Sequence, residues 1–301
     1  MKKSWLLPRE RYHNKELLRQ NITMKFSKQN ILFHIGRMYV KYIERIPYIN
    51  WFNPLITLYL NFRSFPLQQA WRLPVFVYGW PKLFSLYGSM ECVGKCRMGM
   101  VTFNATNQGA PSTPGTATAI DNWGRIIFHG KCQIYTANKI NVGLKGVLEL
   151  GEGSKIMHFC NVTAYELVKI GAQSRIVHRC QVIDTNFHYI ADFNKHKINR
   201  WSRPIEIGDY CWICNSTSVT AGAKIPNHTI VASNSLVNKD YSDIPEESII
   251  GGIPAKFIAN GYRRVENEKL NGILYKYFSD HPDSRAFDFE DNTPHSFFDV
   301  E

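Results

Sequence analysis

Aliphatic residues recur at every sixth position along the second half of the chain. If isoleucine, valine and leucine fill about one position in five, six in succession arise by chance about once in ten thousand trials. A small side chain lies four positions after each of these residues except the last. The aliphatic positions are Ile207, Ile213, Val219, Ile225, Val231 and Val237, and the small ones are Cys211, Thr217, Ala223, Thr229 and Ser235. This double pattern predicts a regular, repeating backbone.

The same pattern extends upstream with interruptions. One run contains Ile170, Ile176 and Val182, and an earlier run contains Leu150, Ile156 and Val162. Cys160 and Cys180 occupy small positions in these runs, so we expect both to be buried fillers. Glu166 stands where a small residue is expected, and this break predicts an irregular corner. Further upstream, Ile127, Ile134 and Ile140 indicate one looser coil.

A six-residue step excludes an amphipathic helix. At about 100° per residue, a step of six turns through about 600° and scatters the apolar side chains around the helix axis. A β-solenoid with three flat sides explains the pattern, because each hexapeptide then supplies one short strand and one corner. Three hexapeptides complete a coil, and successive coils stack about 4.8 Å apart. The fold class predicted is therefore mainly β, a parallel β-helix.

A resemblance to a known family begins at Ile207. The chain contains IGDYCWICNSTSVTAGAKIPNHTIVASNSLVNKD, followed by IPEESIIGGIPAKFI. This segment resembles the hexapeptide-repeat acyltransferases, in particular capsular and exopolysaccharide O-acetyltransferases and galactoside and maltose acetyltransferases. The resemblance extends over residues 126–258 and is most specific from Val182 onward. Cys214 and Ile253 depart from the family pattern, which weakens the transfer of roles to single residues around the coenzyme.

The resemblance implies properties that the periodicity alone does not establish. They are a left-handed winding of the β-helix, a homotrimer with active sites between subunits, acetyl-CoA as cosubstrate, and no metal.

The chain is accordingly divided into four parts. These are a basic α-helical N-terminal region (1–67), short strands and a loop capping the β-helix (68–125), the β-helix itself (126–259, with an active-site loop at 188–206), and a C-terminal helix with an acidic tail (260–301).

The candidate catalytic residue is His188. It lies where the six-residue step breaks, in a loop inserted between Val182 and Ile207. An imidazole with a pKa near 6.5 suits the removal of a hydroxyl proton during acetyl transfer. The segment DTNFH also resembles the D-x-x-F-H segment of capsular O-acetyltransferases, in which the histidine is the base. Asp184 either orients this imidazole or is a turn residue, and the sequence leaves both roles open.

Other site residues follow from the register and from the resemblance. His158, His178 and Asn215 occupy equivalent outward positions in successive coils, with Ser233 next, and so predict a polar column. The resemblance implies that His158 contacts substrate and that the backbone N–H of Asn215 holds the oxyanion, whereas His178 is equally well explained as part of an exposed polar ladder. Substrate contacts are also assigned to Trp212, which borders the cleft in the family, and to Arg200 and Trp201 in the loop. The coenzyme contacts implied are Ala232, Ser233, Asn238 and Lys239 for the pantetheine arm, and Lys256 and Arg263 for the phosphates.

Net charge and cysteine content limit the kinds of partner and the cellular location to be expected. The formal net charge of +11 attracts anions, including coenzyme phosphates and acidic lipids; we expect no nucleic acid partner. Seven cysteines without zinc-type spacing favour a reducing, cytoplasmic location. Residues 46–62 are apolar and aromatic but contain Pro47 and Pro54, so they predict helices packed on the protein or lying at the inner face of a membrane rather than a span.

The function predicted is acetyl-CoA-dependent O-acetylation of a sugar or polysaccharide precursor, with His188 as general base. One alternative is N-acetylation of an amino-sugar nucleotide. A second is a γ-carbonic anhydrase-like zinc protein, which uses the same solenoid with three histidines on the metal. A third is a solenoid that serves only as a scaffold.

Overall fold

The computed structural model describes residues 51–106 and 116–300. The chain divides into a unit of Met1–Ile46 and a unit of Pro47–Glu301, and every described residue belongs to the second. Most of the predicted N-terminal helical region therefore lies outside the described residues. None of the described helices is long and apolar enough to cross a bilayer.

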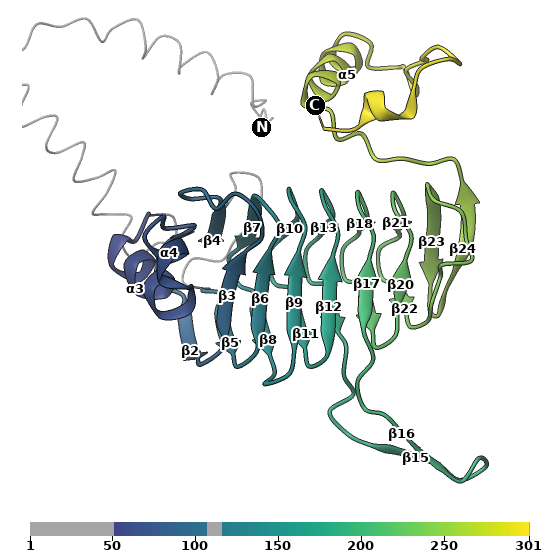
Figure 1. Cartoon of the computed structure of the whole chain (residues 1–301). Helices are drawn as coiled ribbons and strands as arrows, with labels where there is room; N and C mark the ends of the chain where they lie inside the picture. The colour runs from purple at the N-terminus through teal and green to yellow at the C-terminus, as the bar shows by residue number, and fades with distance from the viewer. Residues whose placement is uncertain (1–50, 107–115, 301) are drawn as a thin grey trace, which may run out of the picture. The chain divides into compact units, whose positions relative to one another are not determined.

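Three parallel sheets form the sides of a β-helix, as the six-residue period predicts (Figure 1). The first sheet contains β1 (Val75–Val77), β4 (Val101–Ala105), β7 (Cys132–Tyr135), β10 (Lys155–Ile156), β13 (Arg175–Ile176), β18 (Trp212–Ile213), β21 (Ile230–Val231), β23 (Ser248–Gly252) and the antiparallel β24 (Ala255–Asn260). The second contains β2 (Lys82–Leu86), β5 (Ala119–Asn122), β8 (Lys139–Val142), β11 (Asn161–Ala164), β14 (Gln181–Ile183), β19 (Ser218–Thr220) and β22 (Leu236–Val237). The third contains β3 (Ser89–Cys92), β6 (Arg125–Phe128), β9 (Val147–Leu150), β12 (Leu167–Ile170), β17 (Ile205–Ile207) and β20 (Lys224–Ile225).

The register places the repeated aliphatic residues on top of one another inside the β-helix. Ile156 pairs with Ile176, Ile176 with Ile213, and Ile213 with Val231, and all four are at most 1% exposed. The predicted small fillers are also buried, among them Cys211, whose thiol pKa burial raises to about 12. A thiol with so high a pKa is inert at neutral pH.

The β-helix begins earlier than the sequence predicted. We expected residues 68–125 to cap it, but Val75 pairs with Val101 in parallel, and β2, β3, β5 and β6 continue the second and third sheets. Two coils thus begin before residue 126. The prediction missed them because the segment between β4 and β5 interrupts the six-residue step.

Helices lie at both ends of the described chain. Helix α3 (Pro54–Ser64) and the short α4 (Leu67–Ala70) precede β1. The expected C-terminal helix is α5 (Glu268–Asp280). Asn267 caps its start by accepting hydrogen bonds from the N–H groups of Lys269 and Leu270. A short 3₁₀ turn, η2 (His295–Phe298), follows in the acidic tail.

Candidate functional site

Each coil turns three corners, and we name them by the sheets they join. Corner 1 lies between the first and second sheets, corner 2 between the second and third, and corner 3 between the third and first. At corner 2, after β14, the chain leaves the β-helix to form an antiparallel hairpin of β15 (Ile190–Asp192) and β16 (Lys197–Asn199). It projects from the edge where β8 and β11 end (Figure 1). This hairpin falls within residues 188–206, where the sequence predicted an active-site loop, and that role stays a prediction.

The base of the hairpin is fixed to neighbouring coils by backbone and guanidinium contacts. Asn186 donates its backbone N–H to the carbonyl of Trp201 at 2.8 Å. The guanidinium of Arg203 donates to the carbonyl of Ala221 in the next coil at 2.7 Å. Gly222, which follows Ala221, has a φ of +86°, a left-handed conformation that favours glycine, and a Cβ there would lie 2.9 Å from the guanidinium carbon of Arg203.

His188 lies on the exposed side of this base. It lines a pocket of about 430 Å³ together with Arg200, Arg203, Asn186, Ile190 and Asn199. Arg200 is paired with Glu166 of the preceding coil at 3.6 Å. The pocket therefore combines an accessible imidazole with two guanidinium groups, an arrangement suited to a polar or anionic ligand.

Asp184 has the turn role rather than the orienting role. It is fully buried, and its carboxylate accepts hydrogen bonds from the backbone N–H groups of Tyr165, Glu166 and Leu167 at 2.7–3.0 Å. Burial raises the pKa of this carboxyl, whereas the three N–H donors oppose the rise. The carboxylate thus holds the irregular corner at Glu166, and the hypothesis that it orients His188 is not supported.

The predicted polar column exists at corner 1. His158 and His178 stack with ring centroids 5.4 Å apart, and the Nδ1 atom of His158 lies 3.0 Å from the hydroxyl of Thr136. The backbone N–H of the residue after His178 bonds to the carbonyl of His158, and Asn215 and Ser233 continue the column. His158 is only 1% exposed, so within one chain its side chain is buried in the packing of corner 1 and hydrogen-bonded there to Thr136.

The histidine stack predicts a loss of stability in mild acid. Burial, together with the charge of His178, lowers the pKa of His158, and burial with the charge of Arg179 lowers that of His178. The unfolded chain, with histidine pKa values near 6.5, binds more protons than the folded one just below that pH, so stability falls as the pH drops through this window. Urea unfolding at pH 7.5 and 5.5 should show a smaller loss in His178→Gln than in the wild type.

The exposed His196 provides a matched control for this experiment. His196→Gln should retain the wild-type dependence of stability on pH. An identical pH dependence in His178→Gln and the wild type would show that the stack is not the source of the effect.

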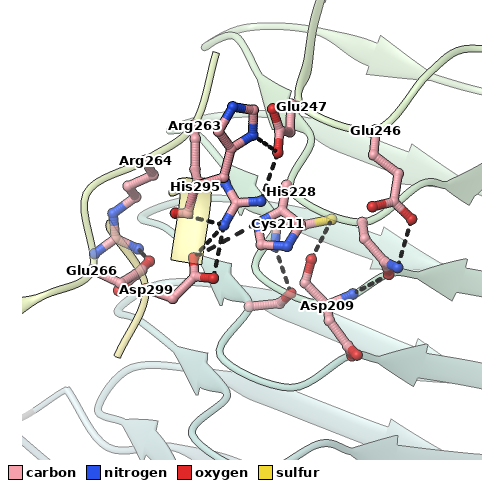
Figure 2. Close-up of polar contacts among 12 residues, drawn as sticks. Asp209, Cys211, His228, Glu246, Glu247, Arg263, Arg264, Glu266, His295 and Asp299 are labelled. Atoms are coloured by element: carbon pink, nitrogen blue, oxygen red, sulfur yellow. Dashed lines mark hydrogen bonds and ion pairs between the residues drawn. The ribbon is translucent and has the colours of Figure 1, made fainter. Parts of the chain in front are cut away.

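Trp212 is covered by the protein's own C-terminal segment. The guanidinium of Arg264 lies 5.4 Å from the centre of the Trp212 ring, and Arg264 is also paired with Glu266 (Figure 2). Glu266, whose side chain is 2% exposed, also receives a hydrogen bond from Arg175 at 2.7 Å. Trp212 is half-buried beside this ion pair, and its predicted contact with substrate stays a prediction.

Arg263 is likewise unavailable for coenzyme phosphates. Its guanidinium binds the carboxylate of Asp299 at 2.7 and 2.8 Å and that of Glu247 at 2.6 Å (Figure 2). His295 contacts the same Glu247 oxygen at 2.9 Å. These contacts neutralise Arg263 and fasten the acidic tail to corner 3.

The remaining coenzyme candidates are divided between two corners. Ala232 and Ser233 lie at corner 1, whereas Asn238 and Lys239 follow β22 at corner 2. The ammonium of Lys239 lies 5.0 Å from the centre of the Tyr241 ring, and Lys256 is exposed on β24.

One chain therefore does not assemble all the predicted site residues. His188, Arg200 and Trp201 lie at corner 2, and His158, His178 and Asn215 lie at corner 1, on the opposite edge of the second sheet. The three histidines needed by the carbonic anhydrase alternative do not meet in one chain. Across the described ranges, we find no group of three or more histidine, cysteine or acidic side chains arranged to hold a metal ion.

Sequence reasoning missed Tyr165 and Phe187, which pack together at the hairpin base beside the predicted Trp201. Tyr165 contacts Phe187 and Trp201, each at 5.5 Å between ring centroids. The signal was present in the break at Glu166, because the two extra residues of that corner include Tyr165.

The chain is similar to a curated protein and to several solved structures. No protein-family model matches the chain. A curated relative from Escherichia coli K12, "Putative lipopolysaccharide biosynthesis O-acetyl transferase WbbJ", is 27% identical over 122 residues, which cover 38% of this chain and 61% of that protein. The chain thus matches less than two thirds of the length of this relative.

Solved structures of similar fold include three acyltransferases. The polySia-specific acetyltransferase NeuO matches with 18% identity and a TM-score of 0.37, covering 72% of this chain and 91% of that one. The Vibrio cholerae acetyltransferase VCA0836 with acetyl-CoA has 21% identity and a TM-score of 0.37, covering 45% and 70%. The Bacillus cereus N-acyltransferase AntD, in complex with dTDP and 3-hydroxybutyryl-CoA, has 13% identity and a TM-score of 0.37, covering 77% and 99%. Scores below 0.5 support no transfer of roles to single residues. The six-residue period and the three-sheet β-helix are the features on which the resemblance to the hexapeptide-repeat acyltransferases rests, and the similarity to WbbJ agrees with that resemblance.

Proposed function

We propose that the protein transfers an acetyl group from acetyl-CoA to a hydroxyl group of a sugar or polysaccharide precursor, with His188 as general base. The observation that carries the proposal is the accessible imidazole of His188 beside two arginines, at the corner where the β-helix is interrupted. The relationship to WbbJ, whose name refers to O-acetylation in lipopolysaccharide biosynthesis, supports the choice of a sugar hydroxyl.

The chemistry needs one proton acceptor and one oxyanion site. The imidazole of His188 removes the hydroxyl proton as the oxygen attacks the thioester carbon. The C–S bond then breaks, and the imidazolium returns the proton to the departing thiolate. A backbone N–H at corner 1, such as that of Asn215, would stabilise the oxyanion.

A homotrimer would bring these groups together. His188 and Asn215 lie at opposite edges of the second sheet, so the two groups of one chain cannot act in the same site. Corner 2 of one subunit facing corner 1 of the next would complete it, as the family resemblance implies. Lys256, Lys239 and Asn238 remain the candidates for contacts with coenzyme A, whereas Arg263 is withdrawn from this role.

The activity is tested by acetyl-CoA turnover with a panel of glycans, measured as release of the free thiol. An O-acetyl ester in the product is cleaved by hydroxylamine, whereas an N-acetyl amide is not, so this treatment separates O-acetylation from the N-acetyltransferase alternative. Thiol release that no glycan stimulates would count against the proposal.

Contact with an anionic membrane surface is a second part of the proposal, supported by helix α3. Its buried residues are largely polar: Asn61 hydrogen-bonds with the N–H and C=O groups of Val75, and the hydroxyl of Thr57 accepts from the N–H of Val77. Its apolar residues face solvent with the spacing of a helical stripe, and are Leu55, Leu58, Tyr59 and Phe62, between 39% and 70% exposed. Residues 45–90 contain no acidic residue, which suits an anionic surface.

This contact predicts binding to lipid vesicles. Full-length protein should co-sediment with vesicles containing about a third phosphatidylglycerol, less so at high salt, and Leu55→Glu/Leu58→Glu should weaken this roughly tenfold. Ile273→Glu, on the exposed side of α5, is the control and should bind like the wild type. Equal binding to neutral vesicles, or wild-type binding by the double variant, would refute membrane contact through α3.

A further inference from the structure

Aromatic side chains follow corner 2 along the β-helix and end beside His188. We call this set the aromatic track. It consists of Tyr87, Trp123, Tyr165, Phe187, Tyr189 and Trp201. These residues belong to four of the first five coils, although they are far apart in the sequence.

The strand register places the first three members above one another. Leu86 pairs with Asn122, Asn122 with Val142, and Val142 with Ala164, so the residues that follow these strands occupy equivalent corner positions. Those residues are Tyr87, Trp123, Gly143 and Tyr165. At about 4.8 Å per coil, Tyr87 and Tyr165 are about 14 Å apart along the axis.

Ring contacts connect the members at both ends of the track. The rings of Tyr87 and Trp123 lie 4.7 Å apart between centroids. At the other end, Tyr165 contacts Phe187 and Trp201, and Trp201 contacts Tyr189 at 6.0 Å. His188 stands between Phe187 and Tyr189 in the sequence, so the track reaches the proposed base.

The coil without an aromatic residue does not leave a gap at this corner. A Cβ at Gly143 would lie 2.8 Å from the Cδ1 atom of Tyr165, so the Tyr165 ring extends over the glycine of the preceding coil. Leu144 follows it at the same corner and is 76% exposed. The apolar surface thus continues from Trp123 to Tyr165.

Four of the six side chains of the track are exposed to solvent, which packing within the chain does not explain, whereas Tyr165 and Trp201 are half-buried. Tyr87 is 70%, Trp123 44% and Tyr189 70% exposed. A pocket of about 510 Å³ lies at the distal end and is lined by Tyr87, Trp123, Arg63 and Arg125, among others. The pocket containing His188 lies at the other end.

We propose that the aromatic track binds an extended oligosaccharide chain, whose acetylated sugar lies at His188 and whose neighbouring sugars stack on the track as far as Trp123 and Tyr87. This inference rests on the proposed function and adds the class of acceptor: a glycan of several sugars rather than a single sugar nucleotide. The C–H face of a pyranose ring is apolar and covers an aromatic ring, while its hydroxyl edge remains available to polar groups.

The spacing and the charge of the surface favour this ligand. The track spans four coil steps from Tyr87 to the hairpin, about 19 Å, which exceeds the reach of one sugar. The guanidinium of Arg63 lies 5.8 Å from the centre of the Tyr87 ring, and Arg125 lines the same pocket, so the distal end accepts anionic sugars as well as neutral ones.

The test is binding of labelled full-length protein, without acetyl-CoA, to length series of one to eight sugars of malto-, cello- and hyaluronan oligosaccharides. Binding should strengthen with length in at least one series. Trp123→Ala should weaken binding of the longest members about tenfold and leave binding of the monosaccharide unchanged. Tyr275→Ala is the control, because Tyr275 is an aromatic residue 79% exposed on α5, outside the track and outside corners 1 and 2, and it should bind like the wild type.

Several results would overturn the proposal. These are no binding in any series, no dependence on length, equal binding by Trp123→Ala and the wild type, or dissociation of the protein's oligomer by Trp123→Ala in sedimentation velocity, which would make the track a subunit contact. Because acetyl-CoA is absent, these results are separate from the turnover assay. A protein that binds long glycans but transfers no acetyl group would refute only the proposed function.

Discussion

Replacing His188 with alanine is expected to lower kcat/KM for acetyl transfer roughly 10²–10⁴-fold, the usual contribution of a general base. The side chain is exposed on the hairpin and lines its pocket, so its removal leaves the β-helix core untouched. The loss should therefore appear in turnover of acetyl-CoA with a glycan acceptor and not in the thermal unfolding midpoint.

His196 provides the control for this substitution as well. It lies on the same hairpin and is exposed, but it does not line the His188 pocket. His196→Ala should retain turnover within about threefold of the wild type, because it removes no group from the proposed site. Wild-type turnover in His188→Ala would exclude the imidazole from the mechanism.

Replacing Asp184 with alanine is expected to destabilise the protein by about 3–5 kcal/mol. The substitution removes the acceptor of the N–H groups of Tyr165, Glu166 and Leu167. A buried donor without a partner costs about 1–3 kcal/mol, and these three hydrogen bonds are only partly buried, so each donor falls toward the lower end of that range. For a chain of this size the unfolding midpoint should fall by about 10 °C. Differential scanning calorimetry measures this shift.

Asp184→Asn separates the structural role from a catalytic one. The amide keeps one acceptor oxygen and nearly the same shape, so stability should recover in part. Activity should follow the fraction of folded protein in both variants. Normal stability with a large loss of kcat in Asp184→Asn would instead return Asp184 to the role of positioning His188.

The later coils were predictable from the sequence because their corners have equal lengths, whereas the early coils were not because theirs differ. From Ile207 to Val237, each corner has the same length, so buried aliphatic residues are evenly spaced in the sequence. Between β4 and β5 the connection is longer, and at Tyr165–Glu166 two residues are added, which shifts the spacing without changing the stacking. Strands of neighbouring coils pair through backbone hydrogen bonds whatever the length of the connection between them. An inserted residue therefore leaves the pairing intact but breaks the regular spacing that a search for a six-residue period detects.

The candidate site was also predictable in part, where the six-residue step or its interruption marks it. The hairpin at His188 was detectable as an interruption of the six-residue step. The column of His158 and His178 followed from counting register, and the ring stacking confirms it. The contacts of Arg263 with Asp299 and Glu247 were not predictable, because they join residues far apart in the sequence and depend on how the tail returns to corner 3.

The hairpin leaves the β-helix after Ile183 and the chain returns at Ile205 in register. Ile205 pairs with Val168 of the preceding coil, and Ile207 pairs with Ile225 of the following one, as they would if the hairpin were a simple corner. The insertion thus leaves the strand register of the coils on either side unchanged. A segment that varies here need not alter the pairing of the scaffold, which makes this corner a natural place for acceptor preference to diverge among related proteins.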